Sequence, residues 1–116
     1  MKIKYLAACL PLVFAAGAAQ ADAPSFEQVS EILQKNACLA CHQVETKVVG
    51  PAYREVAEKY KGDPANAELL AKHIKEGSQG VWGAVPMPPN VAVTDDDLNL
   101  VVDWLMAGAP NYLHHN

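Results

Sequence analysis

The sequence has little positive charge. Nine lysine and arginine residues stand against thirteen aspartate and glutamate residues among its 116, which gives a formal net charge of −4. A surface of this sign argues against nucleic acid and anionic membrane as partners, because both are negatively charged. The chain also has no internal repeat and no low-complexity segment, and its length suits one small domain.

The sequence also lacks a long apolar run. The longest, residues 5–19, is too short to predict a membrane-spanning helix. It follows a basic start at residues 1–4 and ends in Ala-Gln-Ala at 19–21, which fits the small-x-small rule for signal peptidase. We therefore predict that residues 1–21 are a cleaved signal peptide, that the protein is exported to the periplasm, and that residues 22–116 form a single domain.

Cysteine is scarce, and one of the three cysteines lies in the apolar run. Leu-Ala-Ala-Cys at residues 6–9 has the local look of a lipoprotein processing site, which would leave a lipid-anchored protein. About five apolar residues precede that site, fewer than the roughly 7–15 of a signal peptide's apolar region. Cleavage after Ala21 is therefore favoured, and it removes Cys9, Lys2 and Lys4. The remaining chain has a formal charge of −6 and two cysteines.

The spacing of apolar residues predicts four short helices and no strands, an all-α fold. The expected helices cover residues 26–36, 52–61 and 65–76, and a last one begins at Thr94 and ends before Gly108. Ser25 and Gln28 have the spacing of a capping box, and Gly62 and Gly77 are expected helix stops. The last helix is expected to bury Leu98, Val101, Val102 and Leu105. The first three helices carry apolar residues at helical spacing, together with His73 on the third: Phe26, Val29, Ile32, Leu33, Val56, Tyr60, Leu69, Leu70 and Ile74.

Residues 78–93 are predicted to form a loop. Three prolines and two glycines in the string GVWGAVPMPPN, residues 80–90, make a helix or a strand there improbable. The loop is nevertheless apolar and contains Trp82 and Met87. An apolar loop is expected to cover an apolar surface.

Two cysteines and a histidine stand together at residues 38–42, Cys-Leu-Ala-Cys-His. A structural zinc site needs four ligands, but the chain offers one cysteine pair, and His114 and His115 are adjacent in a terminal tail. A redox dithiol would need a preceding strand and a βαβ context, which the pattern lacks. An ordinary disulfide suits an exported protein but leaves His42 and the apolar loop unexplained.

Covalently attached haem accounts for all of these features. Cys38 and Cys41 would add to the two vinyl groups of the haem as thioethers, and His42 would supply the proximal ligand of the iron. In an exported chain the motif therefore predicts one haem c. A large apolar cofactor would also explain how a chain with a thin apolar core folds.

The second axial position of the iron separates a carrier from a catalyst, because an open position admits oxygen, peroxide or carbon monoxide. The candidate ligands are His73, Met87, Met106, His114 and His115. Met106 is expected to pack in the last helix, and the terminal histidines are expected to be solvated. Met87 is favoured, because the prolines around it can hold its thioether at low entropic cost.

Three strings resemble those of a known family. CLACH at residues 38–42, VGPAY at 49–53 and IKEGSQGVWGAVPMPPN at 74–90 are similar to the small bacterial class I c-type cytochromes of the cytochrome c-551 group. The resemblance runs from about Phe26 to Leu105, and Met87 follows His42 by 45 residues, as in that group. It implies the class I cytochrome c fold, with about four short helices around one covalently bound haem.

The resemblance also implies roles for individual residues. Cys38 and Cys41 would be the thioether anchors, and His42 and Met87 the axial ligands of the iron. The carbonyl group of Pro51 would accept a hydrogen bond from the proximal imidazole and fix the orientation of its ring.

Three further side chains correspond to positions near the haem in that family. Asn90 matches a side chain near the methionine sulfur that tunes the reduction potential. Trp82 matches an indole whose N–H reaches a haem propionate, and His73 aligns with a basic residue beside the same propionate. Residues 108–116 extend past the usual last helix and receive no role.

The sequence therefore predicts a periplasmic one-electron carrier, not an enzyme, and by default a monomer. The exposed haem edge is expected to be rimmed by Leu39, Val48, Val49, Val85 and Pro86, a small apolar patch that suits brief docking. By resemblance, the partners are a quinol-oxidising complex upstream and a nitrite reductase, terminal oxidase or cytochrome peroxidase downstream. The alternatives are an enzyme or gas sensor from whose iron Met87 dissociates, and a redox-inert stabilising haem.

Overall fold

The computed structural model describes residues 23–111, which form four α-helices and one short 3₁₀ turn. In chain order the elements are α1 (Phe26–Lys35), the 3₁₀ turn η2 (Cys38–Ala40), α2 (Tyr53–Tyr60), α3 (Asn66–Glu76) and α4 (Asp95–Met106). Within the described residues the only β pairing is two isolated bridges, His42 with Lys47 and Ser78 with Met87. The predicted all-α fold class is therefore confirmed.

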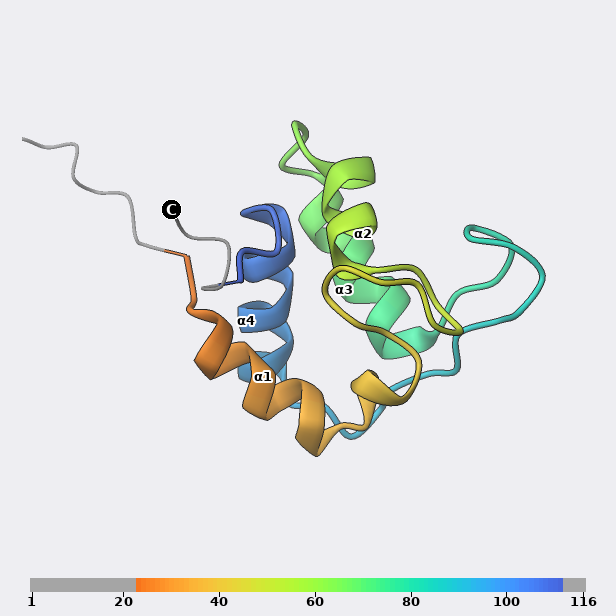
Figure 1. Ribbon diagram of the computed structural model, residues 1–116, viewed down its shortest axis with the longest axis horizontal. Coiled ribbons are helices and arrows are strands. Elements are labelled where there is room, and N and C mark those ends of the chain that lie inside the picture. Colours follow the sequence, from red (N-terminus) through yellow and green to blue (C-terminus); the bar gives the residue numbers. More distant parts are fainter. Residues whose placement is uncertain (1–22, 112–116) are drawn as a thin grey trace, which may run out of the picture.

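The last helix is the centre of the packing. α4 contacts α1, α2 and α3, and Figure 1 shows α1 beside α4 at one side of the molecule and the long loop after α3 at the other. Among residues 23–111, no helix is long and apolar enough to cross a membrane.

The helix starts follow the capping signals in the sequence. At α1 the Ser25 hydroxyl accepts a hydrogen bond from the Gln28 backbone N–H at 3.1 Å, and the Gln28 side chain accepts one from the Ser25 N–H at 3.0 Å. At α4 the Thr94 hydroxyl accepts one from the Asp97 N–H at 3.1 Å. These bonds satisfy amide groups that have no partner inside the helix, which is why both helices begin where the sequence predicts.

The core contains several side chains that the sequence did not single out, among them Val44, Tyr53 and Val93. The largest fully buried side chain is Trp104, 0 % exposed, which the sequence analysis left out. Of the two adjacent leucines of α3, Leu69 is 38 % exposed and Leu70 is buried in the core. The other buried apolar side chains are Val29, Ile32, Leu33, Val44, Ala52, Tyr53, Val56, Ala57, Tyr60, Val93, Leu98, Val101, Val102, Leu105 and Ala109.

The chain folds back on itself after α4. The helix ends at Met106, and the turn that follows buries Ala109 completely in a left-handed conformation, with φ 53°. This turn is the first part of the segment to which the sequence analysis gave no role. The expected signal peptide, Cys9 and the terminal pair His114 and His115 lie outside the described residues.

Candidate functional site

A cavity of about 420 Å³ lies between the 3₁₀ turn, the segment that follows it, α3, α4 and the loop of residues 78–93. Its volume falls in the usual range of ligand sites, about 300–1,000 Å³. Its walls are mostly apolar. Among residues 23–111 they include no aspartate or glutamate, and Lys47 is their only lysine or arginine. Such a cavity suits a large apolar ligand.

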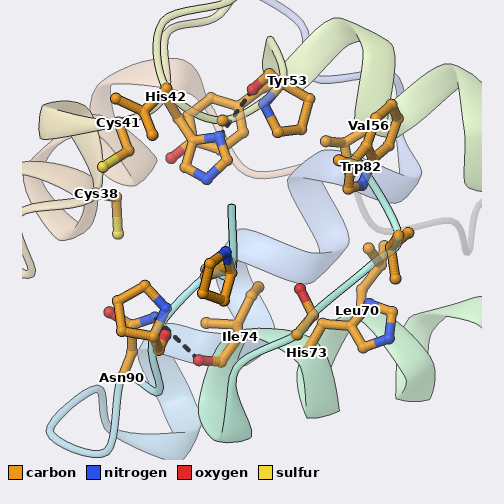
Figure 2. Close-up of a pocket in the computed structure, with 18 of the residues that line it drawn as sticks. Cys38, Cys41, His42, Tyr53, Val56, Leu70, His73, Ile74, Trp82 and Asn90 are labelled. Carbon is orange, nitrogen blue, oxygen red and sulfur yellow. Dashed lines mark hydrogen bonds between the residues drawn. The ribbon is translucent and has the colours of Figure 1, made fainter. Parts of the chain in front are cut away.

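The two cysteines lie at one edge of this cavity. Both Cys38 and Cys41 are half-buried and neither is in a disulfide (Figure 2). The turn that carries them is closed by hydrogen bonds from the N–H groups of Cys41 and His42 to the Cys38 carbonyl, at 3.1 and 3.0 Å. Burial raises the pKa of the Cys38 thiol. One short turn thus presents two thiols and an imidazole to the same space.

His42 is buried, 8 % exposed, and its ring points into the cavity (Figure 2). Its Nδ1 donates a hydrogen bond to the Pro51 carbonyl oxygen at 2.8 Å. Because a carbonyl can only accept, this bond assigns the proton to Nδ1 and leaves the lone pair of Nε2 free to bind a metal.

Two neighbours hold the imidazole of His42 from its faces. The Tyr53 ring is stacked on it, with centroids 4.9 Å apart and planes at 23°. The Gly50 backbone approaches so closely that an added Cβ would lie 2.5 Å from His42 Cε1, a distance that real side chains do not adopt. Burial raises the pKa of the Tyr53 phenol, so the ring that stacks on His42 is neutral.

Met87 lines the same cavity from the loop of residues 78–93. Ser78, the first residue of the loop, forms a bridge with Met87 in which the Ser78 N–H donates to the Met87 carbonyl at 3.1 Å and the Met87 N–H to the Ser78 carbonyl at 2.9 Å. Gly77, with φ 87°, allows this approach, because a Cβ there would lie 2.7 Å from the Met87 carbonyl oxygen. Backbone hydrogen bonds therefore fix the position of Met87.

Asn90 closes the same loop onto α3. Its backbone N–H donates to the carbonyls of Ile74 and Lys75 at 3.1 and 3.2 Å. Its side-chain amide donates to the carbonyls of Ile74 and Pro88 at 3.0 and 3.3 Å. Figure 2 shows Asn90 across the cavity from His42. The influence of Asn90 on the Met87 sulfur stays a prediction.

His73 and Trp82 both line the cavity, as the resemblance implied for residues near one propionate. His73 is half-buried, and its ring meets the Tyr60 ring edge-on at 6.4 Å. Trp82 is 39 % exposed, and Lys59 Nζ lies 5.6 Å from its ring centroid. Trp82 is therefore not a core aromatic, and its contact with a propionate stays a prediction.

The remaining expected residues fall into two groups. Val49, Val85 and Pro86 line the cavity, whereas Leu39 is half-buried against the core and Val48 is exposed outside the lining. Met106 packs partly buried against the core and does not line the cavity.

Among residues 23–111 no group of three or more His, Cys, Asp and Glu side chains could hold a metal ion.

Sequence reasoning missed Gly50, Tyr53 and Gly77 as parts of this site. The first two lie in the VGPAY string, which was recognised as a motif but assigned a role only at Pro51. Gly77 was expected only to stop a helix. In each case the missing information was the tertiary neighbour, His42 or Met87, which no spacing along the chain specifies.

Comparison with known proteins gives a consistent result. Residues 26–109 match the family model described as Cytochrome c. Cytochrome c-552 of Nitrosomonas europaea is 53 % identical over 91 residues, which span 78 % of this chain and 82 % of that protein. Cytochrome c-551 of Pseudomonas aeruginosa is 51 % identical over 78 residues, 66 % of this chain and 74 % of that protein.

A solved structure shows the same arrangement. The crystal structure of wild-type Nitrosomonas europaea cytochrome c552 superposes with a TM-score of 0.65 at 52 % sequence identity, over 68 % of this chain and 98 % of that one.

Proposed function

This chain belongs to the cytochrome c family, as a small class I c-type cytochrome of the c-551 group, and we propose that it is a one-electron carrier with its iron held between His42 and Met87. Members of this family carry a single covalently attached haem c, whose iron cycles between the ferric and ferrous states. The observation that carries the proposal is the hydrogen bond between His42 Nδ1 and the Pro51 carbonyl, which leaves Nε2 free toward a cavity that Met87 also lines.

The donor set fits a haem. Cys38 and Cys41 are free thiols at one edge of an apolar cavity, and they would hold the haem as thioethers. His42 Nε2 and the Met87 thioether sulfur would be the axial ligands of the iron. A thioether ligand favours the ferrous state and raises the reduction potential relative to a second histidine.

The protein's own contribution is to hold both ligands in place. The bond from His42 to the Pro51 carbonyl orients the imidazole and increases its basicity. The Ser78–Met87 bridge and the four hydrogen bonds of Asn90 hold the loop that carries Met87. With both ligands retained, little rearrangement accompanies a change of oxidation state, which favours electron transfer over binding of an external ligand.

The polar side chains at the cavity are proposed to bind the propionates. His73 is supplied by the last turn of α3 and Trp82 by the loop, and both line the cavity.

The partner surface is proposed to be the apolar rim of the cavity. Val49, Val85 and Pro86 line the cavity and are exposed, with Val85 66 % accessible. Although the chain is acidic, none of the described residues that line the cavity is an aspartate or glutamate. A small uncharged patch suits weak, brief contact with a redox partner. The proposed partners are a quinol-oxidising complex and a nitrite reductase, terminal oxidase or cytochrome peroxidase, met by a monomer in the periplasm.

A reductive titration tests the carrier function. A carrier takes up and returns one electron per haem reversibly, and it does not consume peroxide when reduced protein and peroxide are mixed. An enzyme or gas sensor with an open iron would instead turn over peroxide or bind carbon monoxide at neutral pH. Catalytic consumption of peroxide by the purified protein would overturn the proposal.

A further inference from the structure

The turn after α4 is fixed by its own hydrogen bonds. The Ala107 N–H donates to the Asp103 carbonyl at 3.0 Å, and the Ala109 N–H donates to the Trp104 carbonyl at 2.9 Å. The indole Nε1–H of Trp104 donates to the Pro110 carbonyl at 2.8 Å. Residues 107–110, which we call the C-terminal turn, are therefore held against the buried side chain of Trp104.

Arg54 joins this turn to the start of α2. Its Nε donates to the Ala109 carbonyl at 3.2 Å, a contact between residues 55 positions apart. Its guanidinium also lies 3.4 Å from a carboxylate oxygen of Glu45. The backbone N–H of Arg54 donates to the Val44 carbonyl at 3.0 Å. The residue next to Tyr53 is thus bound both to the C-terminal turn and to the segment that follows His42.

Two aromatic rings, those of Trp104 and Tyr53, connect the C-terminal turn to the proximal imidazole. The Trp104 ring meets the Tyr53 ring edge-on, at 5.4 Å and 74°. Tyr53 in turn is stacked on His42 at 4.9 Å. The Tyr53 backbone N–H is bound to the Gln43 carbonyl at 2.8 Å. Tyr53 therefore contacts Trp104 with one part of its ring and His42 with another, inside a closely packed core that leaves it little room to move.

We infer that the C-terminal turn, acting through Arg54 and Trp104, positions Tyr53 against His42 and thereby restricts the orientation of the proximal imidazole. The Pro51 bond fixes one nitrogen of that ring and the Gly50 backbone limits its movement on one side, but neither contact prevents the ring from tilting toward the position that Tyr53 occupies. A stacked neighbour restricts that tilt. The inference rests on the proposed function, in which His42 is an axial ligand, and it makes Arg54, Tyr53 and Trp104 positioning residues.

The test uses the ferrous holoprotein, which is suited to NMR, and its variants Arg54→Gln and Trp104→Phe. Arg54→Gln removes the bond to Ala109 at a half-exposed site, so folding is expected to survive, and Trp104→Phe keeps a ring but removes the bond to Pro110. Glu45→Gln is the matched control, because it weakens the ion pair of Arg54 and leaves the Nε bond to Ala109 intact.

The measured quantity is the hydrogen-exchange rate of the His42 Nδ1–H, compared with that of the Leu70 amide in α3. In Arg54→Gln the His42 rate is expected to rise about threefold or more relative to the Leu70 rate, since a hydrogen bond to a charged group is lost. In the ferric protein, the order of the haem methyl shifts, which reports the orientation of the iron's ligands, is expected to change. Glu45→Gln is expected to change neither.

The outcomes separate the inference from a general loss of stability. An equal rise at His42 and Leu70, or no rise at either, would overturn it, because a turn that only stabilises the fold opens both sites together. Failure of the proposed function would give a different NMR result. If His42 is not an axial ligand, its ring protons in the wild-type protein lack the ring-current shifts that an adjacent haem produces.

Discussion

The two sides of the cavity hold their proposed ligands in different ways. On the proximal side, residues 42–53, the imidazole of His42 is buried and is confined by the Pro51 carbonyl, the Tyr53 ring and the Gly50 backbone. On the distal side, the loop of residues 78–93 is largely exposed and is held by backbone hydrogen bonds to the end of α3.

The difference has a physical consequence. Close packing resists any change in volume, whereas a loop held by a few hydrogen bonds can open when those bonds are lost. We therefore expect substitutions on the proximal side to destabilise the protein by steric clash. Substitutions on the distal side are expected to release the methionine ligand.

The largest effect is expected on the proximal side, from Gly50→Ala. The new Cβ would lie 2.5 Å from His42 Cε1, and the imidazole cannot retreat because Tyr53 is stacked on it. We expect the free energy of unfolding of the holoprotein, measured with guanidinium chloride, to fall by about 3 kcal/mol. Gly62→Ala is the control, since it has nothing within 4 Å and carries only the strain of φ 95°, worth about 1 kcal/mol. Equal losses in the two variants would contradict the tight proximal packing.

The distal counterpart compares Gly77→Ala with Gly80→Ala. Both glycines have positive φ, 87° and 80°, but only at Gly77 would a Cβ meet the Met87 carbonyl, at 2.7 Å. We expect Gly77→Ala to cost about 2 kcal/mol and Gly80→Ala about 1 kcal/mol of unfolding free energy. The weak long-wavelength band of methionine sulfur bound to ferric iron should diminish only in Gly77→Ala. A band that diminishes equally in both variants would mean that the bridge does not place Met87.

A smaller distal effect is expected from Asn90→Ala. The variant loses the side-chain hydrogen bonds to the Ile74 and Pro88 carbonyls, and we expect a loss of about 1–2 kcal/mol. The reduced protein should also begin to bind carbon monoxide slowly as the loop opens. Asn99→Ala, on the exposed face of α4, should stay within about 0.5 kcal/mol of wild type. If Asn90→Ala matches Asn99→Ala in both measurements, Asn90 does not hold the loop.

The smallest effect is expected from His73→Leu. His73 lines the cavity, and we propose that it contacts a haem propionate. Loss of that contact should shift the reduction potential of the holoprotein slightly and leave the weak long-wavelength band of the methionine sulfur unchanged. A reduction potential identical to that of the wild type would contradict the proposed contact.

The fold was predictable where local chemistry determines it. Ser25, Gln28 and Thr94 cap their helices through contacts three residues apart, so the sequence alone locates the starts of α1 and α4. The burial of Trp104 was not predictable in this way. Its indole is satisfied by the Pro110 carbonyl, and that contact requires the chain to reverse direction after α4.

The site likewise has features that the sequence alone predicts and features that depend on the folded chain. The Cys-Leu-Ala-Cys-His string and the proline-rich loop identify the chemistry, because their residue types are particular to it. The stacking of Tyr53 on His42 and the fit of Gly50 and Gly77 depend on segments that meet only in the folded chain. Sequence patterns thus indicate the ligands, and the three-dimensional structure is needed to identify what positions them.

The most direct test of the central claim is the visible spectrum of the purified ferric protein, followed by that of the ferrous protein with and without carbon monoxide. Closed ligation by His42 and Met87 predicts a weak long-wavelength band in the ferric form and no change on adding carbon monoxide at neutral pH. In Met87→Ala the band should vanish and carbon monoxide should bind readily. A wild-type protein without the band that binds carbon monoxide readily would contradict the closed site and, with it, the carrier function.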